Sequence, residues 1–186
     1  MNEELLKLIS ATLTGIGEDV ERDGLHDTPR RVVKSWSETY GGYNEDPKVH
    51  LKKVFDVTHG QLITLNNVDF YSTCEHHMLP FFGTADISYL PAEGGGVVGL
   101  SKLARVVHGY ARRLQVQERL TDQIADALVD VLNPRAVAVR VRAKHLCMLA
   151  RGVRVSNGEM VTTSLRGELI TDNALRDEWL NGLPNK

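Results

Sequence analysis

The sequence has little of several features that mark particular classes of protein. Its 186 residues include only two cysteines, Cys74 and Cys147, which argues against a scaffold held by disulfides. Two reduced thiols are typical of a cytoplasmic protein, and the acidic start Met1–Leu5 has no apolar stretch, so we expect no secretory signal. No apolar run approaches the length of a membrane span, so we expect no transmembrane helix.

An excess of charge of one sign is also missing. The chain has 22 Lys and Arg residues against 24 Asp and Glu, a formal net charge of −2. General binding to nucleic acid needs a strongly basic surface, so this balance argues against such a partner while leaving room for a local basic pocket. The hydrophobic fraction of 42% and the charged fraction of 25% are ordinary for a globular domain with a sizeable core.

The hydrophobic pattern predicts an α+β protein. Apolar residues recur at helical spacing over 3–16, 100–114 and 116–131. A helix start at Asp27-Thr28-Pro29 predicts a further helix over 28–40. Strand patterns occupy 61–72, with a bulge or turn near Asn66-Asn67, and then 84–90, 137–148 and 160–169. Consecutive strands that can form hairpins predict an antiparallel four-stranded sheet with the two long helices on one face. We divide the chain into an N-terminal helical segment, 1–45, and a catalytic domain that is a single structural unit, 46–186.

Two short segments carry residues that bind transition metals. Segment 74–77 (Cys-Glu-His-His) places a thiol and an imidazole three residues apart, and segment 145–147 (His-Leu-Cys) supplies another pair that would face one side of a strand. Zinc favours these ligands, and two cysteines with one histidine would leave a fourth position for water, as in a catalytic site. Two alternatives remain. One is a structural zinc site with four protein ligands, both cysteines and two histidines. The other is no metal at all, because a lone cysteine is most often a small buried hydrophobe.

Cations gather where the helix 100–114 begins. Lys102 and Arg105 share a face there and stand beside Ser101, an arrangement that suits a phosphate group at a helix N-terminus. Three further cations are candidates for the same role, namely Arg151 after the second metal segment and Arg31 and Lys34 on the second helix. The alternative is a solvated basic face, which is the commoner role of such residues.

Gln117 and Glu118 open the next helix. A carboxylate there can simply favour the helix dipole. The more specific alternative is that it accepts two parallel hydrogen bonds from the ring N–H and amino group of guanine, as carboxylates do from arginine.

Taken together, these segments resemble the GTP cyclohydrolase I family. The resemblance rests on 74–77, 99–105, 113–121, 145–148, 151–152 and 162–164, with a weaker match at 28–31, all in the right order. It implies the tunnelling fold, toroidal decamers with active sites at subunit interfaces, and a zinc-dependent reaction of GTP that gives formate and 7,8-dihydroneopterin triphosphate. The product would serve folate, pterin-cofactor or deazapurine synthesis.

The resemblance also implies roles position by position. The zinc ligands would be Cys74, His77 and Cys147. The catalytic residues would be His76, His145 as the acid that protonates guanine N7, and Ser101 at the sugar. The substrate-binding residues would be Glu118, Gln117, Lys102, Arg105, Arg151, Arg31, Lys34 and Glu75.

Two rival functions can be weighed against this one. Pyruvoyl-tetrahydropterin synthases, which share the tunnelling fold, bind zinc through three histidines, and the nitrile reductase of the deazaguanine pathway needs a cysteine nucleophile apart from any metal. The Cys/His/Cys set disfavours both. A non-catalytic guanine-nucleotide-binding protein with a structural zinc would need His76 or His145 as a fourth ligand.

Overall fold

A computed structural model describes residues 2–184, and their contacts fall into two units, the first ending at Gly41 and the second beginning at Gly42. The predicted division after residue 45 stays a prediction. Within residues 2–184, no helix is both long and apolar enough to cross a membrane.

The first unit consists of the two predicted helices. Helix α1 spans Glu3–Gly15 and is capped by Asn2, whose side-chain oxygen accepts a hydrogen bond from the Glu4 N–H at 3.0 Å. Helix α2 spans Thr28–Thr39, and Pro29 stands in its first turn, where its missing N–H leaves no bond unmade. Both helices are confirmed.

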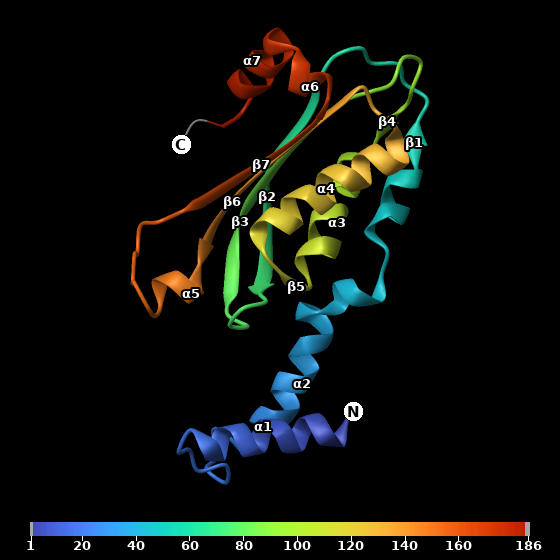
Figure 1. The fold of residues 1–186 in the computed structure, drawn as a ribbon. Coiled ribbons are helices and arrows are strands. Elements are labelled where there is room, and N and C mark those ends of the chain that lie inside the picture. The colour runs from blue at the N-terminus through green and yellow to red at the C-terminus, as the bar shows by residue number, and fades with distance from the viewer. Residues whose placement is uncertain (1, 185–186) are drawn as a thin grey trace. The chain divides into compact units, whose positions relative to one another are not determined.

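The second unit is built around a five-stranded sheet in the order β5-β2-β3-β6-β7 (Figure 1). Its four long strands pair antiparallel with one another: β2 (Ile63–Cys74), β3 (Pro80–Leu90), β6 (Ala136–His145) and β7 (Met160–Gly167). The predicted antiparallel α+β arrangement is thus confirmed. The sheet adds one short strand that the sequence did not indicate, β5 (Leu114–Gln115), which pairs parallel to the end of β2.

Two long helices cover one face of the sheet. Helix α3 spans Leu100–Ala111 and packs on β2, and α4 spans Gln117–Leu132 and packs on β6 and β7 (Figure 1). Their apolar stripes, including Leu103, Val107 and Ile124, are fully buried against the inward residues of the strands, such as Ile87 and Val139. The amphipathic spacing in the sequence therefore predicts the face that packs.

A second, smaller core lies at one end of the opposite face. Ala136 and Ala138 alternate with Val137 and Val139 along β6, so they point away from α3 and α4. Two C-terminal helices cover them, α6 (Glu168–Thr171) and α7 (Asn173–Asn181), with Trp179 buried in the contact. The sequence pattern did not indicate these helices.

Short elements complete the second unit. Two 3₁₀ helices, η1 (Gly41–Asn44) and η2 (Pro47–Lys52), precede a small sheet of β1 (Val54–Phe55) with β4 (Val97–Val98).

One predicted strand was wrong at its C-terminal end. The strand expected over 137–148 stops at His145, and the next four residues form a single helical turn, α5 (Leu146–Leu149). Cys147 therefore stands on a helical turn, and the expectation that it shares a strand face with His145 was wrong. The bulge expected near Asn66-Asn67 is confirmed, because the β2–β3 register shifts between Leu65 and Val68 and Asn67 has a φ of 57°.

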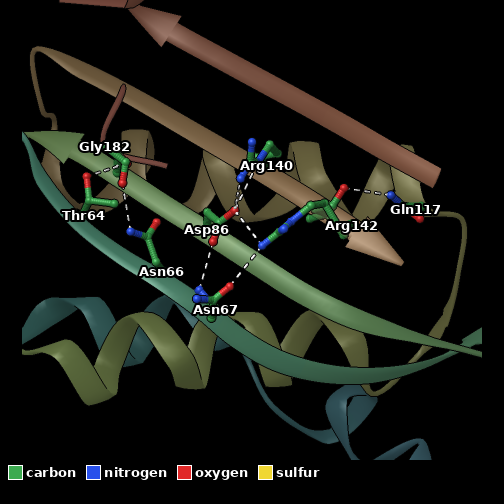
Figure 2. Close-up of polar contacts among 10 residues, drawn as sticks. Thr64, Asn66, Asn67, Asp86, Gln117, Arg140, Arg142 and Gly182 are labelled. Carbon is green, nitrogen blue, oxygen red and sulfur yellow. Dashed lines mark hydrogen bonds and ion pairs between the residues drawn. The ribbon is translucent and has the colours of Figure 1, made fainter. Parts of the chain in front are cut away.

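The bulge supports a buried polar cluster on the face away from α3 and α4 (Figure 2). Asp86 is fully buried and accepts hydrogen bonds from the Asn67 N–H at 2.9 Å and from Nε and Nη2 of Arg140 at 3.1 and 3.0 Å. Arg142 Nη2 lies 3.5 Å from the same carboxylate and donates to Asn67 Oδ1 at 3.0 Å. The carboxylate thus ties β2, β3 and β6 together.

Candidate functional site

The first metal-binding segment forms the turn between β2 and β3. Cys74 ends β2 and is buried, and its N–H and C=O close the turn through hydrogen bonds to Leu79 O at 2.9 Å and from Met78 N at 2.8 Å. Met78 supplies the positive φ, 53°, that the turn requires. His76 and His77 are exposed in this turn, and His76 Nδ1 lies 3.7 Å from Cys74 Sγ.

The second segment brings the other thiol beside the first. Cys147 is half-buried on α5, where burial raises the pKa of its thiol and the neighbouring Cys74 raises it further. The positive charge of Arg151 acts in the opposite direction, so this guanidinium also lies near Cys147. The Cys147 thiol, whose pKa is raised, becomes a good thiolate ligand when a metal cation neutralises it.

The donor set fits zinc, because two thiols and a neighbouring imidazole are ligands that zinc prefers. The predicted triad is nevertheless not assembled: among residues 2–184, no three His, Cys, Asp or Glu side chains lie close enough together to hold a metal ion. The structure brings together Cys74, Cys147 and, more loosely, His76. His77, the predicted third ligand, belongs to no such group among the described side chains.

His145 is the most constrained of the candidate catalytic residues. Its ring stacks on Phe81 with centroids 4.6 Å apart and planes at 4°, because Phe81 and His145 are register partners in β3 and β6. Its Nε2 lies 2.8 Å from the side-chain oxygen of Gln117. Burial lowers the pKa of His145, and the nearby Glu118 carboxylate opposes that shift, so Glu118 also lies on this side of the molecule.

Gln117 and Glu118 take different positions in the first turn of α4. Glu118 is exposed, as expected of a residue that meets a ligand. Gln117 is 1% exposed, and its side-chain amide is engaged by Val141, Met160, Thr162 and His145. Its predicted contact with guanine stays a prediction.

The candidate phosphate residues lie at the start of α3. Ser101 and Arg105 are exposed and Lys102 is half-buried, opposite the buried stripe of that helix. Arg105 borders a cavity of about 540 Å³ between α3, β2 and η2. The cavity is lined by Glu45, His50, Asp69, Phe70, Tyr71, Arg105, His108 and Arg112. None of the candidate metal ligands or catalytic histidines borders it. Within one chain, this cavity therefore contains the candidate phosphate residue Arg105 but neither thiol.

Charged residues that line this cavity form ion pairs with one another. The Glu45 carboxylate accepts from Arg112 Nη2 at 2.6 Å and lies 3.4 Å from His50 Nε2. Burial alone would raise the pKa of Glu45, but these hydrogen bonds outweigh it and lower the pKa.

Three other candidates have their own surroundings. Glu75 forms an ion pair with Arg119, and the hydrogen bond from Arg119 lowers the pKa of this carboxyl. The Glu75 carboxylate is therefore already engaged by a side chain of the same chain. Arg31 and Lys34 are exposed on α2, and Arg31 Nη2 lies 3.4 Å from Asp27 within the first unit.

Sequence reasoning missed three residues around His145. Phe81, Thr121 and Thr162 hold either the histidine or the glutamine that contacts it. The only signal for Phe81 is the pairing of β3 with β6, which brings together residues far apart in the chain.

Comparison with known proteins places these residues in a family context. The family model described as GTP cyclohydrolase I matches residues 5–183. A protein of Bacillus cytotoxicus named GTP cyclohydrolase 1 is 47% identical over 184 residues, which cover 99% of this chain and 97% of that protein. A protein of Bacillus pumilus with the same name is 46% identical over 186 residues, covering 100% and 98% of the two chains.

A solved structure shows a weaker likeness. The crystal structure of the archaeosine synthase QueF-Like in the apo form is 20% identical, with a TM-score of 0.46, and covers 59% of this chain and 97% of that chain. A likeness at this level does not bear on the function of the present chain.

Proposed function

Since the chain belongs to the GTP cyclohydrolase I family and carries the GTP cyclohydrolase I activity, we propose that its reaction takes place at Cys74, Cys147 and His145. The observation that carries this proposal is the pair of adjacent thiols at the end of β2 and on α5, two residues from a histidine fixed between Phe81 and Gln117. In the proposed reaction, water opens the guanine imidazole ring of GTP, formate leaves, and the remainder rearranges to 7,8-dihydroneopterin triphosphate.

We propose that Cys74, Cys147 and His77 hold a zinc ion. When bound, zinc would supply a Lewis acid that lowers the pKa of water to near neutrality. His77 lies in the turn 75–79, next to His76, whose Nδ1 is 3.7 Å from Cys74 Sγ. His76 is proposed as a second proton-transfer group, acting as the ribose opens.

His145 is proposed to protonate guanine N7, which makes C8 electrophilic toward water. Burial lowers the pKa of this imidazole, so near neutral pH it gives up a proton readily. Attack of one water at C8 opens the ring, and a second water releases C8 as formate. Ring closure with the rearranged sugar then expels one water, so one water is consumed overall.

The remaining candidates are proposed to bind the substrate. Exposed Glu118 would hold guanine, with Gln117 beside it and Glu75 in the adjoining turn. Ser101 would contact the sugar. The triphosphate would lie against Lys102, Arg105, Arg151, Arg31 and Lys34.

Several copies of the chain are proposed to form the tunnelling fold and a toroidal decamer. Strand β7 is an edge of the sheet, so its outer backbone groups can pair with a strand of another copy. The cavity beside Arg105 is bordered by neither thiol and by none of His76, His77 and His145, which supports sites completed by residues of a neighbouring copy. We further propose a cytoplasmic enzyme of folate or pterin synthesis.

The direct test is to incubate the purified, zinc-loaded chain with GTP and to measure formate and 7,8-dihydroneopterin triphosphate by mass spectrometry. His145→Ala runs in parallel. We expect both products from the wild type and a loss of about 100-fold or more in the variant, since a positioned acid or base contributes roughly 10²- to 10⁴-fold. Intact GTP after incubation with folded, zinc-occupied wild type would refute the proposal.

A further inference from the structure

The side-chain amide of Gln117 sits in a closed set of hydrogen bonds behind His145. It stands in the first turn of α4 and reaches the backbone of β6, as Figure 2 shows. Its nitrogen lies 3.0 Å from Val141 O, 3.0 Å from Met160 O and 3.1 Å from Thr162 Oγ1. Its oxygen lies 2.8 Å from His145 Nε2. One buried amide therefore joins β6, β7 and the candidate catalytic histidine.

The directions of the neighbouring hydrogen bonds follow from the donors available. The Thr121 hydroxyl donates its one hydrogen to Gln117 O, 2.7 Å away in the preceding turn of α4. Thr121 and Thr162 hydroxyl oxygens are 2.6 Å apart, and Thr121 has no second hydrogen, so Thr162 is the donor in that pair. Thr162 Oγ1 is then left as an acceptor for the amide nitrogen of Gln117.

These directions fix which way the amide faces. If the amide were flipped, its oxygen would meet the carbonyl oxygens of Val141 and Met160, and no hydrogen would lie between them. The nitrogen of the flipped amide would face His145, so Thr162 Oγ1 would no longer accept a hydrogen from the amide. Because the group is 1% exposed, water cannot relieve either conflict. The amide oxygen must therefore face His145.

An amide oxygen is an acceptor only, so the group opposite it must donate. His145 Nε2 thus carries a hydrogen, and in the neutral imidazole Nδ1 holds the lone pair. The Phe81 ring, parallel to the imidazole at 4.6 Å, restricts rotation of the histidine out of this orientation. Both the tautomer and the plane of the ring are set by contacts within the chain.

From this geometry we infer that Gln117 is a positioning residue that holds His145 as the Nε2–H tautomer, with the lone pair of the neutral imidazole on Nδ1. The inference deepens the proposed function and rests on it for the role of His145 in catalysis. This role belongs to the side chain of Gln117, whose polar atoms are all engaged within the chain.

The test reads the tautomer directly. Full-length, zinc-loaded protein labelled with ¹⁵N-histidine is measured by magic-angle-spinning NMR at about pH 8, above the ordinary histidine pKa of about 6.5. The signals of His145 are those that disappear in His145→Gln. We expect a protonated Nε2 and an unprotonated Nδ1 in the wild type and a mixture of tautomers in Gln117→Met. A wild-type His145 protonated at Nδ1 would overturn the inference.

Gln115→Met is the matched control. Gln115 is equally buried, and its amide bonds Tyr110 O and Gln123 Oε1, so its loss removes similar hydrogen bonds without touching His145. We expect Gln117→Met to lower kcat about 10- to 100-fold with KM for GTP changed less than about twofold, and Gln115→Met to leave the His145 signals as in wild type. An unchanged tautomer and kcat in folded Gln117→Met would overturn the inference.

One further variant and the independence of the NMR readout from activity keep the outcome decisive. If Gln117→Met does not fold, Thr162→Val removes one acceptor of the amide at nearly constant shape and is expected to shift the tautomer ratio in the same direction. No shift in that variant would count against the inference. If wild type fails to convert GTP, the proposed function fails, whereas the NMR signals still report whether Gln117 sets the tautomer.

Discussion

Replacing Asp86 by asparagine should destabilise the protein more than any exchange of an exposed carboxylate. Asp86 is fully buried, while the side chains of its partners Arg140 and Arg142 are 19% and 12% exposed. Asparagine nearly preserves the shape and can still accept from the Asn67 N–H, but the two guanidinium groups lose their counter-charge. Removal of one partner from a buried ion pair costs about 3–5 kcal/mol. The slight exposure of both arginines places our expectation near the lower end, about 3 kcal/mol.

The measurement is urea-induced unfolding followed by circular dichroism at a fixed protein concentration, because association of copies would add to the apparent stability. Asp126→Asn is the control. Asp126 forms the same kind of pair with Arg166 at 2.9 Å, but the two side chains are 55% and 33% exposed, so its loss should cost about 1 kcal/mol or less. A loss in Asp86→Asn no larger than in the control would refute the reasoning from burial.

Three further predictions concern other parts of the second unit. Because its hydrogen bonds to Arg112 and His50 lower the pKa of Glu45 below its ordinary 4.5, wild type should be more stable than Glu45→Gln at pH 7. That advantage should vanish as the pH falls through the lowered pKa, and an advantage that persists at acid pH would contradict it. Cys147→Ser should lose most of its zinc on dialysis, measured by plasma mass spectrometry, whereas full occupancy would remove Cys147 from the ligand set. Gly83→Ala should cost about 3 kcal/mol in urea unfolding, since the new Cβ would lie 1.9 Å from Arg142 O, while Gly60→Ala, with open space around it, should change little.

The sequence predicted those parts of the fold where apolar spacing is strong. Helix α4 carries an apolar residue on nearly every turn of one face, and its predicted range differs from the observed one by a single residue at each end. The end of β6 could not be placed in this way. Leu146-Cys147-Met148-Leu149 is a run of apolar residues with no period, and such a run fits a strand and a helical turn equally well.

The candidate site was predictable as a set of residue types and not as an arrangement. Cys74, Cys147 and His145 stand out because few other residues bind metals or move protons near neutral pH. The stack of Phe81 on His145 depends on the register of two strands far apart in the chain, and the bonds of Gln117 depend on how α4 crosses β6 and β7. Neither relation leaves a local pattern in the sequence.

The connection between the two halves of the sheet has a consequence for the order of folding. Strands β2 and β3 are joined by a tight turn, but Leu90 of β3 finds its partner Ala136 only across the whole segment 91–135, which contains α3 and α4. Closing a flexible loop of that length costs roughly 3 kcal/mol in entropy before the central strand pair gains anything. If α3 and α4 have already packed on the β2–β3 hairpin, the flexible part of segment 91–135 that must be closed to pair β6 with β3 is much shorter. Substitutions in the buried stripes of these helices should therefore slow refolding more than they speed unfolding.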